Sequence, residues 1–135
     1  MITWAIPDHL ARSPRPGYLT SRGVTNVHLD AWVKNAKTIG IRSVICLLSK
    51  EELHDYYLYV GIDLLKRYKE LGFEVKHFPV SDCFTSDERA DLLPKIGRVY
   101  AGMEKPCLVH CNAGVERTGT VIDYILRQHA HPPSR

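Results

Sequence analysis

The chain has 135 residues, and 18 Lys and Arg against 15 Asp and Glu give it a net charge of +3 at pH 7. Because 44% of the residues are hydrophobic and 24% are charged, a buried core is feasible and a wholly disordered chain is excluded. The length predicts a single domain over residues 1–135. The basic residues are scattered, which argues against a nucleic-acid partner and is compatible with an anionic substrate.

Signals for export, membrane insertion and metal binding are weak. No apolar run approaches the roughly 20 residues of a membrane span, so no membrane partner is expected. The N-terminus lacks a basic segment followed by a long apolar one, which predicts a cytoplasmic protein. The four cysteines are Cys46, Cys83, Cys107 and Cys111. In a reducing compartment they are not expected to form disulfides. His129 and His131 lack a third ligand nearby, so neither a metal nor another cofactor is predicted.

The first half of the chain predicts two strands and two helices. Residues 3–6 are typical of a short strand, with loop and edge structure after it. Residues 26–39 place apolar side chains at helical spacing. The apolar run at residues 43–48 is typical of a buried parallel strand. Residues 49–71 predict one long helix, and we interpret Glu52 in its first turn as part of a helix cap.

The second half continues the alternation. Residues 73–78 alternate like a strand, and residues 86–103 favour a helix although Pro94 weakens the pattern. A third buried strand at residues 107–110 precedes a helix at residues 117–128. Together these segments predict an α/β fold with a mainly parallel central sheet flanked by helices. Ligands of such sheets bind beyond the carboxyl ends of the strands.

Ten residues at such a strand end, HCNAGVERTG beginning at His110, carry the chemistry of the sequence. A tight loop between a strand and a helix can point its backbone N–H groups inward as an anion site, and this environment stabilises a thiolate at Cys111. Arg117 can hold two phosphate oxygens, and the Thr118 hydroxyl can assist the sulfur as a leaving group. Gly114 permits the backbone to turn. The pattern predicts phosphate chemistry at Cys111.

A second cysteine and arginine six residues apart, Cys83 and Arg89, fit this chemistry poorly. Their loop contains no glycine, and its two acids would repel a phosphate. It also does not connect a buried strand directly to a helix. The alternative for Cys111 and Arg117 is that their spacing arises by chance and that they share no function.

The segment HCNAGVERTG resembles the signature loop of the cysteine-dependent protein tyrosine phosphatase superfamily. HFPVSD at residues 77–82 is similar to the strand and loop that carry the general acid in small dual-specificity phosphatases. The resemblance extends over roughly residues 4–128. It implies a protein tyrosine phosphatase-like α/β fold in a single phosphatase domain that is short at its C-terminus. It also implies phosphomonoester hydrolysis through a phosphocysteine intermediate, without a metal.

The resemblance also assigns roles by position. Cys111 becomes the nucleophile, Arg117 the phosphate clamp, Thr118 the leaving-group helper and Asp82 the general acid. The phosphate-binding cradle is formed by the backbone of Asn112, Ala113, Gly114, Val115, Glu116 and Arg117.

Several assignments have competitors. Asp87 is the alternative general acid, although an acid near a helix start is expected for capping alone. We interpret His110 as a residue that orients the loop, the alternative being a buried histidine without a chemical role. Glu116 stands where many family members have a small residue, and it is expected to point out of the cradle at the pocket rim. Cys46 and Cys83 are candidates to trap an oxidised Cys111 as a disulfide, or inert thiols.

The sequence therefore predicts a protein phosphatase that acts on phosphotyrosine, with phosphoserine, phosphothreonine or a small phosphoester as further candidate substrates. A rhodanese-like sulfurtransferase is the rival enzyme class, because it also places a cysteine in a loop after a strand. A phosphoresidue-binding pseudophosphatase is the non-enzymatic alternative. Intact Cys111, Arg117 and Asp82 argue against it.

Overall fold

The computed structural model describes residues 1–19 and 23–130. Its centre is a five-stranded sheet in the order β1-β2-β5-β3-β4. The strands are β1 (Thr3–Ile6), β2 (Leu10–Ser13), β3 (Ser43–Cys46), β4 (Glu74–His77) and β5 (Cys107–His110). Only β1 and β2 pair antiparallel, and the other three pairings are parallel. This confirms the predicted α/β class with a mainly parallel central sheet.

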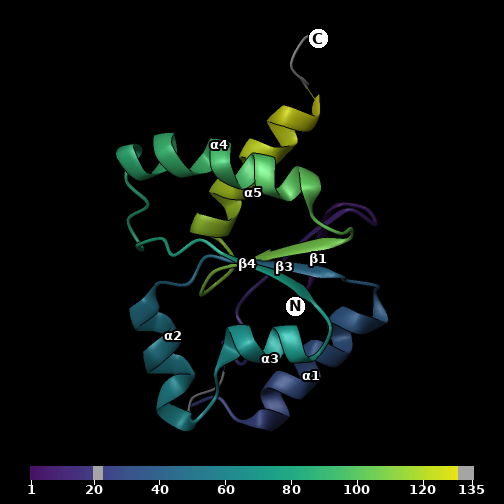
Figure 1. Ribbon diagram of the computed structural model, residues 1–135, viewed down its shortest axis with the longest axis vertical. Helices are drawn as coiled ribbons and strands as arrows, with labels where there is room; N and C mark the ends of the chain where they lie inside the picture. Colours follow the sequence, from purple (N-terminus) through teal and green to yellow (C-terminus); the bar gives the residue numbers. More distant parts are fainter. Residues whose placement is uncertain (20–22, 131–135) are drawn as a thin grey trace.

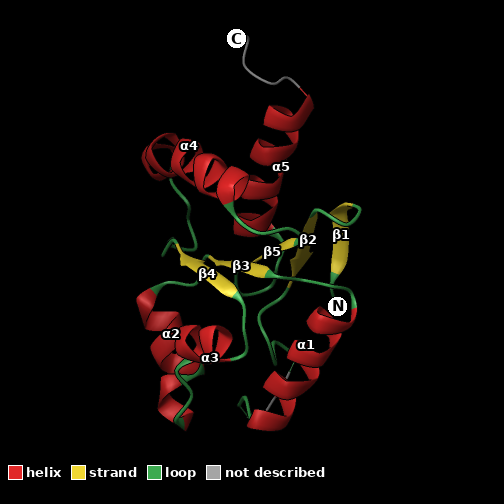
Figure 2. Ribbon diagram, turned by 45° about the vertical axis from the view of Figure 1, so that its right-hand side comes forward, coloured by secondary structure: helices red, strands yellow, loops and turns green. Residues whose placement is uncertain are grey.

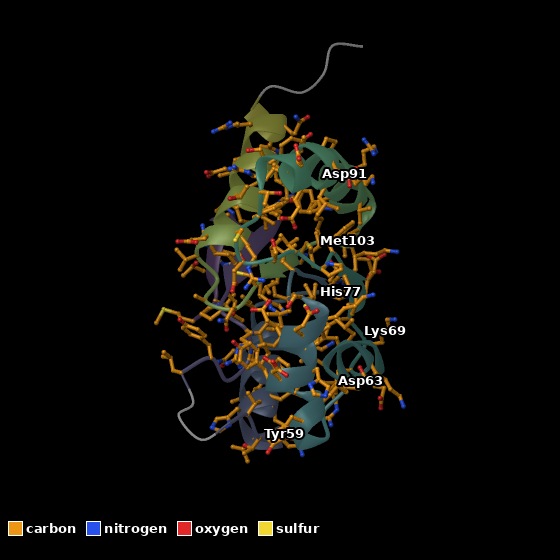
Figure 3. The ribbon with its side chains drawn as sticks, turned by 90° about the vertical axis from the view of Figure 1, so that its left-hand side faces the viewer. Tyr59, Asp63, Lys69, His77, Asp91 and Met103 are labelled. Atoms are coloured by element: carbon orange, nitrogen blue, oxygen red, sulfur yellow. The ribbon has the colours of Figure 1, made fainter. Side chains whose placement is uncertain are left out.

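Helices cover both faces of the sheet. Those of one face are α1 (Asn26–Thr38), α2 (Lys50–Tyr56), the 3-10 turn η1 (Leu58–Val60) and α3 (Leu64–Glu70). Those of the other face are α4 (Ser86–Gly102) and α5 (Glu116–Ala130) (Figure 1). Figure 2 shows the strands as a thin layer between the two groups. In Figure 3, Asp91 of α4 lies above His77 at the end of β4, and Lys69 of α3 lies below it. None of the described helices is both long and apolar enough to cross a bilayer.

The two central strands are buried on both faces, which explains their unbroken apolar sequences. In β5, Leu108 packs into the core beneath α1 and α3, whereas Cys107 and Val109 pack into the core beneath α4 and α5. In β3, Val44 packs into the core beneath α1 and α3, and Ile45 packs into the core beneath α4 and α5. Burial on both faces fixes the register of the strands, and therefore fixes where each strand ends.

The predicted single helix at residues 49–71 is wrong, because the structure divides it into α2, η1 and α3. Gly61 ends η1 in the left-handed region, with φ of 83°. Asp63 then starts α3 by accepting a hydrogen bond at Oδ1 from the Lys66 N–H at 3.2 Å. The apolar spacing continues across the break because Tyr57 turns inward, where its hydroxyl donates to the Pro16 carbonyl at 2.7 Å. A local cap thus overrides the helical periodicity.

Strand β2 was predicted only as loop and edge structure. It carries no alternating pattern, because Leu10, Ala11 and Ser13 are all buried and Arg12 is partly buried in a strand that pairs with β1 on one side and β5 on the other. Helix α4 forms as predicted and accommodates Pro94 within it. His131, for which no metal binding is predicted, lies outside the described residues.

Candidate active site

The loop between β5 and α5 forms one side of a pocket of about 240 Å³. Cys111 directly follows β5 and is buried, with 3% of its surface exposed, and Glu116 begins α5. The pocket is lined by Asp82, Cys111, Asn112, Ala113, Val115, Glu116 and Arg117. The structure thus brings Asp82 to the same pocket as Cys111 across 29 residues of sequence.

Gly114 allows the loop to turn. Its φ is 75°, and a Cβ at this position would collide with the backbone carbonyl of Ser13. Within the described part of the chain, no residue accepts a hydrogen bond from the backbone N–H groups of residues 112–117. Free N–H groups at the start of a 15-residue helix form a site that favours an anion. The loop can therefore bind a phosphate with its backbone.

Arg117 is held from several sides and is only 4% exposed. Its Nη1 donates to Glu52 Oε1 at 2.6 Å and to the Val80 carbonyl at 3.0 Å. Its Nη2 donates to Glu52 Oε2 at 2.8 Å and lies 2.9 Å from Asp82 Oδ1. These contacts use the two terminal nitrogens, and no described residue accepts from Nε. The guanidinium is fixed in one orientation beside Cys111.

Glu52 was interpreted from sequence only as part of a helix cap. It does cap α2, because its Oε1 accepts from the Ser49 N–H at 2.9 Å. The same carboxylate also pairs with Arg117. Burial alone would raise the pKa of Glu52, but the hydrogen bonds from Arg117 and from the Ser49 backbone lower it overall. The Glu52 hydrogen bond also raises the pKa of Arg117. No feature of the sequence around Glu52 indicates that its carboxylate also pairs with Arg117.

The two candidate acids are in different places. Asp82 lies in the loop after β4, with its side chain 84% exposed over the pocket. Asp87 lies in the first turn of α4, as expected of a helix-start acid, and is not among the residues that line the pocket. Glu88 stabilises the loop that contains Asp82, because it accepts hydrogen bonds from Ser81 Oγ at 2.8 Å and from the Thr85 N–H at 3.0 Å. The geometry favours Asp82.

His110 is fully buried and contacts the backbone of Cys111. Its Nδ1 lies 3.1 Å from the Cys111 carbonyl, and its Nε2 lies 2.9 Å from the Tyr68 hydroxyl. Since a carbonyl can only accept, Nδ1 carries the proton and Nε2 accepts from Tyr68. Burial lowers the pKa of His110 to about 4, so the ring is neutral at pH 7. Tyr68, which has no distinguishing sequence signal, thus fixes the histidine that precedes Cys111.

Thr118 is buried in the first turn of α5. Its Oγ1 has no hydrogen-bond partner within residues 1–19 and 23–130. Leaving a buried hydroxyl unpaired costs roughly 1–3 kcal/mol. Thr118 is not among the residues that line the pocket, and it follows Arg117, which does line it.

The other thiols differ in exposure. Cys46 ends β3 opposite His110 in the sheet register, and burial raises its pKa to about 12. Cys83 is exposed beside Asp82. A disulfide to either residue stays a prediction.

The pocket rim is acidic and apolar. Val115 is 62% exposed, and Glu116 beside it is also exposed. No cationic side chain of the described residues forms an ion pair with Glu116. An acid at the rim therefore faces solvent and any group attached to a bound phosphate.

Comparisons with known proteins identify the family and agree with the fold. The chain resembles Tk-PTP, solved in a mutant form, with 27% identity, 98% of this chain and 74% of that chain covered, and a TM-score of 0.60. It shares its fold with the DUF442 protein from Shewanella putrefaciens CN-32, at 18% identity with the same coverage and TM-score. No curated protein matches the sequence. A family model described as PTP-SAK, Swiss Army Knife protein, DSP-PTPase phosphatase domain, matches residues 12–135. The chain therefore belongs to the PTP-SAK family of DSP-PTPase phosphatase domains.

Proposed function

We propose that this phosphatase domain hydrolyses phosphotyrosine in proteins through a phosphocysteine intermediate, with phosphoserine, phosphothreonine and small phosphoesters as further substrates. One observation carries the proposal. The buried Arg117 and the unpaired N–H groups of the loop surround Cys111 in a single pocket that Asp82 also lines. This arrangement matches the charges of a transferring phosphoryl group.

The first step transfers the phosphoryl group to sulfur. The Cys111 thiolate attacks phosphorus, and the bond between phosphorus and the ester oxygen breaks. Asp82, protonated at this stage, gives its proton to the departing oxygen. Arg117 and the loop N–H groups hold the three non-bridging oxygens, whose charge is spread in the transition state.

The second step returns the enzyme to its starting state. A water molecule attacks the phosphocysteine, and the Asp82 carboxylate takes its proton. The bond between phosphorus and sulfur breaks, and the Thr118 hydroxyl donates a hydrogen bond to the leaving sulfur. This role accounts for the unpaired, buried Oγ1 of Thr118. Inorganic phosphate then leaves the cradle.

Asp82 must leave Arg117 for this cycle to run. In the structure its Oδ1 lies 2.9 Å from Arg117 Nη2. A bound phosphate competes for the same guanidinium and repels the carboxylate, so it favours release of Asp82, which takes up a proton from solvent before it donates that proton to the ester oxygen. The high exposure of Asp82 leaves room for this movement.

An assay with p-nitrophenyl phosphate tests the reaction class. We expect the wild-type chain to release p-nitrophenol and Cys111→Ser to release none, while Cys111→Ser still binds inorganic phosphate because the cradle is backbone. Sulfur transfer from thiosulfate to cyanide without phosphatase activity would instead identify a rhodanese-like enzyme. Phosphopeptide binding without any turnover would identify a pseudophosphatase. We further propose that the domain is cytoplasmic.

A further inference from the structure

Arg12 of β2 contacts the loop without lining the pocket. Its Nη2 donates to the Gly114 carbonyl at 2.8 Å and to the Val115 carbonyl at 3.1 Å. The two residues lie 102 and 103 positions further along the chain. Strand β2 reaches them because it pairs in parallel with β5, with Ser13 opposite His110. The contact therefore approaches the loop from the sheet.

The planar trans peptide gives this contact a consequence for the pocket. The carbonyl of one residue and the N–H of the next point in opposite directions. A donor that holds the Gly114 carbonyl toward β2 consequently turns the Val115 N–H the other way, toward the space above Cys111. No other described residue donates to the Gly114 carbonyl. This one peptide thus depends on Arg12.

The neighbouring peptides have other supports. The Val115 carbonyl also accepts from the Gly119 N–H at 2.7 Å, so α5 itself orients the N–H of Glu116. The Asn112 carbonyl accepts from the backbone N–H of Arg15 at 2.9 Å, which orients the N–H of Ala113. A change of the Arg12 side chain leaves both of these hydrogen bonds in place.

We propose that Arg12 is a positioning residue of the phosphate cradle, which acts by holding the Gly114 carbonyl so that the Val115 N–H faces the bound phosphate. The inference rests on the proposed function, because it assumes that the loop binds phosphate. Arg12 touches neither the substrate nor Cys111. Arg12 acts on the single peptide group between Gly114 and Val115, so the Val115 amide signal reports specifically on the loss of Arg12.

The test uses Arg12→Met, which keeps an unbranched stem and removes the donor, in the Cys111→Ser protein. Arg42→Met is the matched control, because Arg42 is exposed, precedes β3 at the opposite end of the sheet, and carries the same charge. Inorganic phosphate is titrated into each protein, and the backbone amide resonances are followed by NMR. We expect Arg12→Met to raise the Kd for phosphate by about tenfold and Arg42→Met to leave it unchanged.

The amide shifts separate positioning from a general charge effect. In the starting protein, phosphate should shift the Ala113 and Val115 amides strongly. In Arg12→Met the Val115 shift should be lost while the Ala113 shift persists, since Arg15 still holds the Asn112 carbonyl. Loss of both shifts in equal measure, persistence of the Val115 shift, or a Kd equal to that of the control would overturn the proposal.

The proposal stays testable if Arg12→Met does not fold. In that case the starting protein decides, because a phosphate titration that leaves the Val115 amide unmoved would refute the orientation inferred for it. Failure of the proposed function is distinguishable: the wild-type chain would then neither hydrolyse p-nitrophenyl phosphate nor bind phosphate at the loop. An active wild type with an unaffected Arg12→Met refutes only the role of Arg12.

Discussion

Glu52 of α2 holds Arg117 of α5 through two parallel contacts, Nη1 to Oε1 at 2.6 Å and Nη2 to Oε2 at 2.8 Å. The pair joins a helix on one face of the sheet to the first turn of a helix on the other face. A guanidinium held in this way is pre-oriented, so binding of a phosphate does not have to order it. The relation between these two residues leads to the first prediction.

Replacing Glu52 by Gln should lower both stability and turnover. The variant leaves the buried Arg117 without the Glu52 carboxylate, and breaking a buried pair in this way costs roughly 3–5 kcal/mol of the free energy of unfolding. Its kcat/KM for p-nitrophenyl phosphate should fall at least about tenfold, because the guanidinium loses its fixed orientation. Glu51→Gln, at the exposed neighbouring position, is the control and should match the wild type in urea unfolding and in kinetics. Equal behaviour of the two variants would show that the pair does not position Arg117.

The same pair predicts acid sensitivity. Since the folded protein lowers the pKa of Glu52 below its ordinary 4.5, the carboxylate stabilises the fold above that pH. This contribution is lost as the pH falls through the lowered pKa.

His110 should dominate the pH dependence of stability at somewhat higher pH. Burial lowers its pKa from 6.5 to about 4, so between these values the unfolded chain takes up a proton that the folded chain does not. The free energy of unfolding should therefore be highest above pH 6.5, where the contribution of the neutral His110 is fully present. It should fall by about 3 kcal/mol as the pH decreases to 4. Urea unfolding from pH 4 to 8 measures this. His110→Asn should flatten the profile and the exposed-site variant His54→Asn should not. A profile unchanged in His110→Asn would contradict the assignment.

Asp82→Asn should slow esters with poor leaving groups by about 100-fold or more, the scale of general acid catalysis. Aryl esters with good leaving groups need less protonation and should lose less. Asp87→Asn, in the first turn of α4, is the matched control and should keep wild-type rates with both kinds of ester. Equal losses for good and poor leaving groups would exclude Asp82 as the acid. A leaving-group dependence in Asp87→Asn would transfer the role to that residue.

Glu116 should disfavour substrates that carry several phosphates. It is exposed at the pocket rim and has no cationic partner among the described residues, so a second phosphate near the scissile one meets an uncompensated negative charge. Glu116→Gln should raise kcat/KM for an inositol polyphosphate by about three- to tenfold relative to a phosphotyrosine peptide. An unchanged ratio of the two kcat/KM values would show that Glu116 does not determine selectivity.

The strand, turn and helix around Cys111 could be predicted from the sequence because their information is local. The strand, the turn at Gly114, the helix start and the cysteine and arginine that flank the turn all lie within the eleven residues 107–117. Glu52 is different, since it stands 65 residues from Arg117 and its spacing from Ser49 already satisfies a helix cap. Arg12 and Tyr68 are likewise ordinary in their local sequence. Their roles arise only when the sheet order places β2 beside β5 and α3 beneath it.

The break in the predicted helix at residues 49–71 has the opposite cause. Its signals, Gly61 and Asp63, are local, but the apolar period runs across them because Tyr57 and Leu64 face the same core. Periodicity alone cannot distinguish one long helix from two short ones that pack on one surface.

The most direct test of the account is to trap the phosphoryl group on the enzyme. Wild-type protein is mixed with p-nitrophenyl phosphate, quenched within milliseconds in an alkaline denaturant and digested at alkaline pH, and the peptides are analysed by mass spectrometry. The account predicts a phosphoryl group on Cys111, formed together with a burst of p-nitrophenol and absent from Cys111→Ser. Turnover with phosphate on another residue, or undiminished turnover in Cys111→Ser, would contradict it.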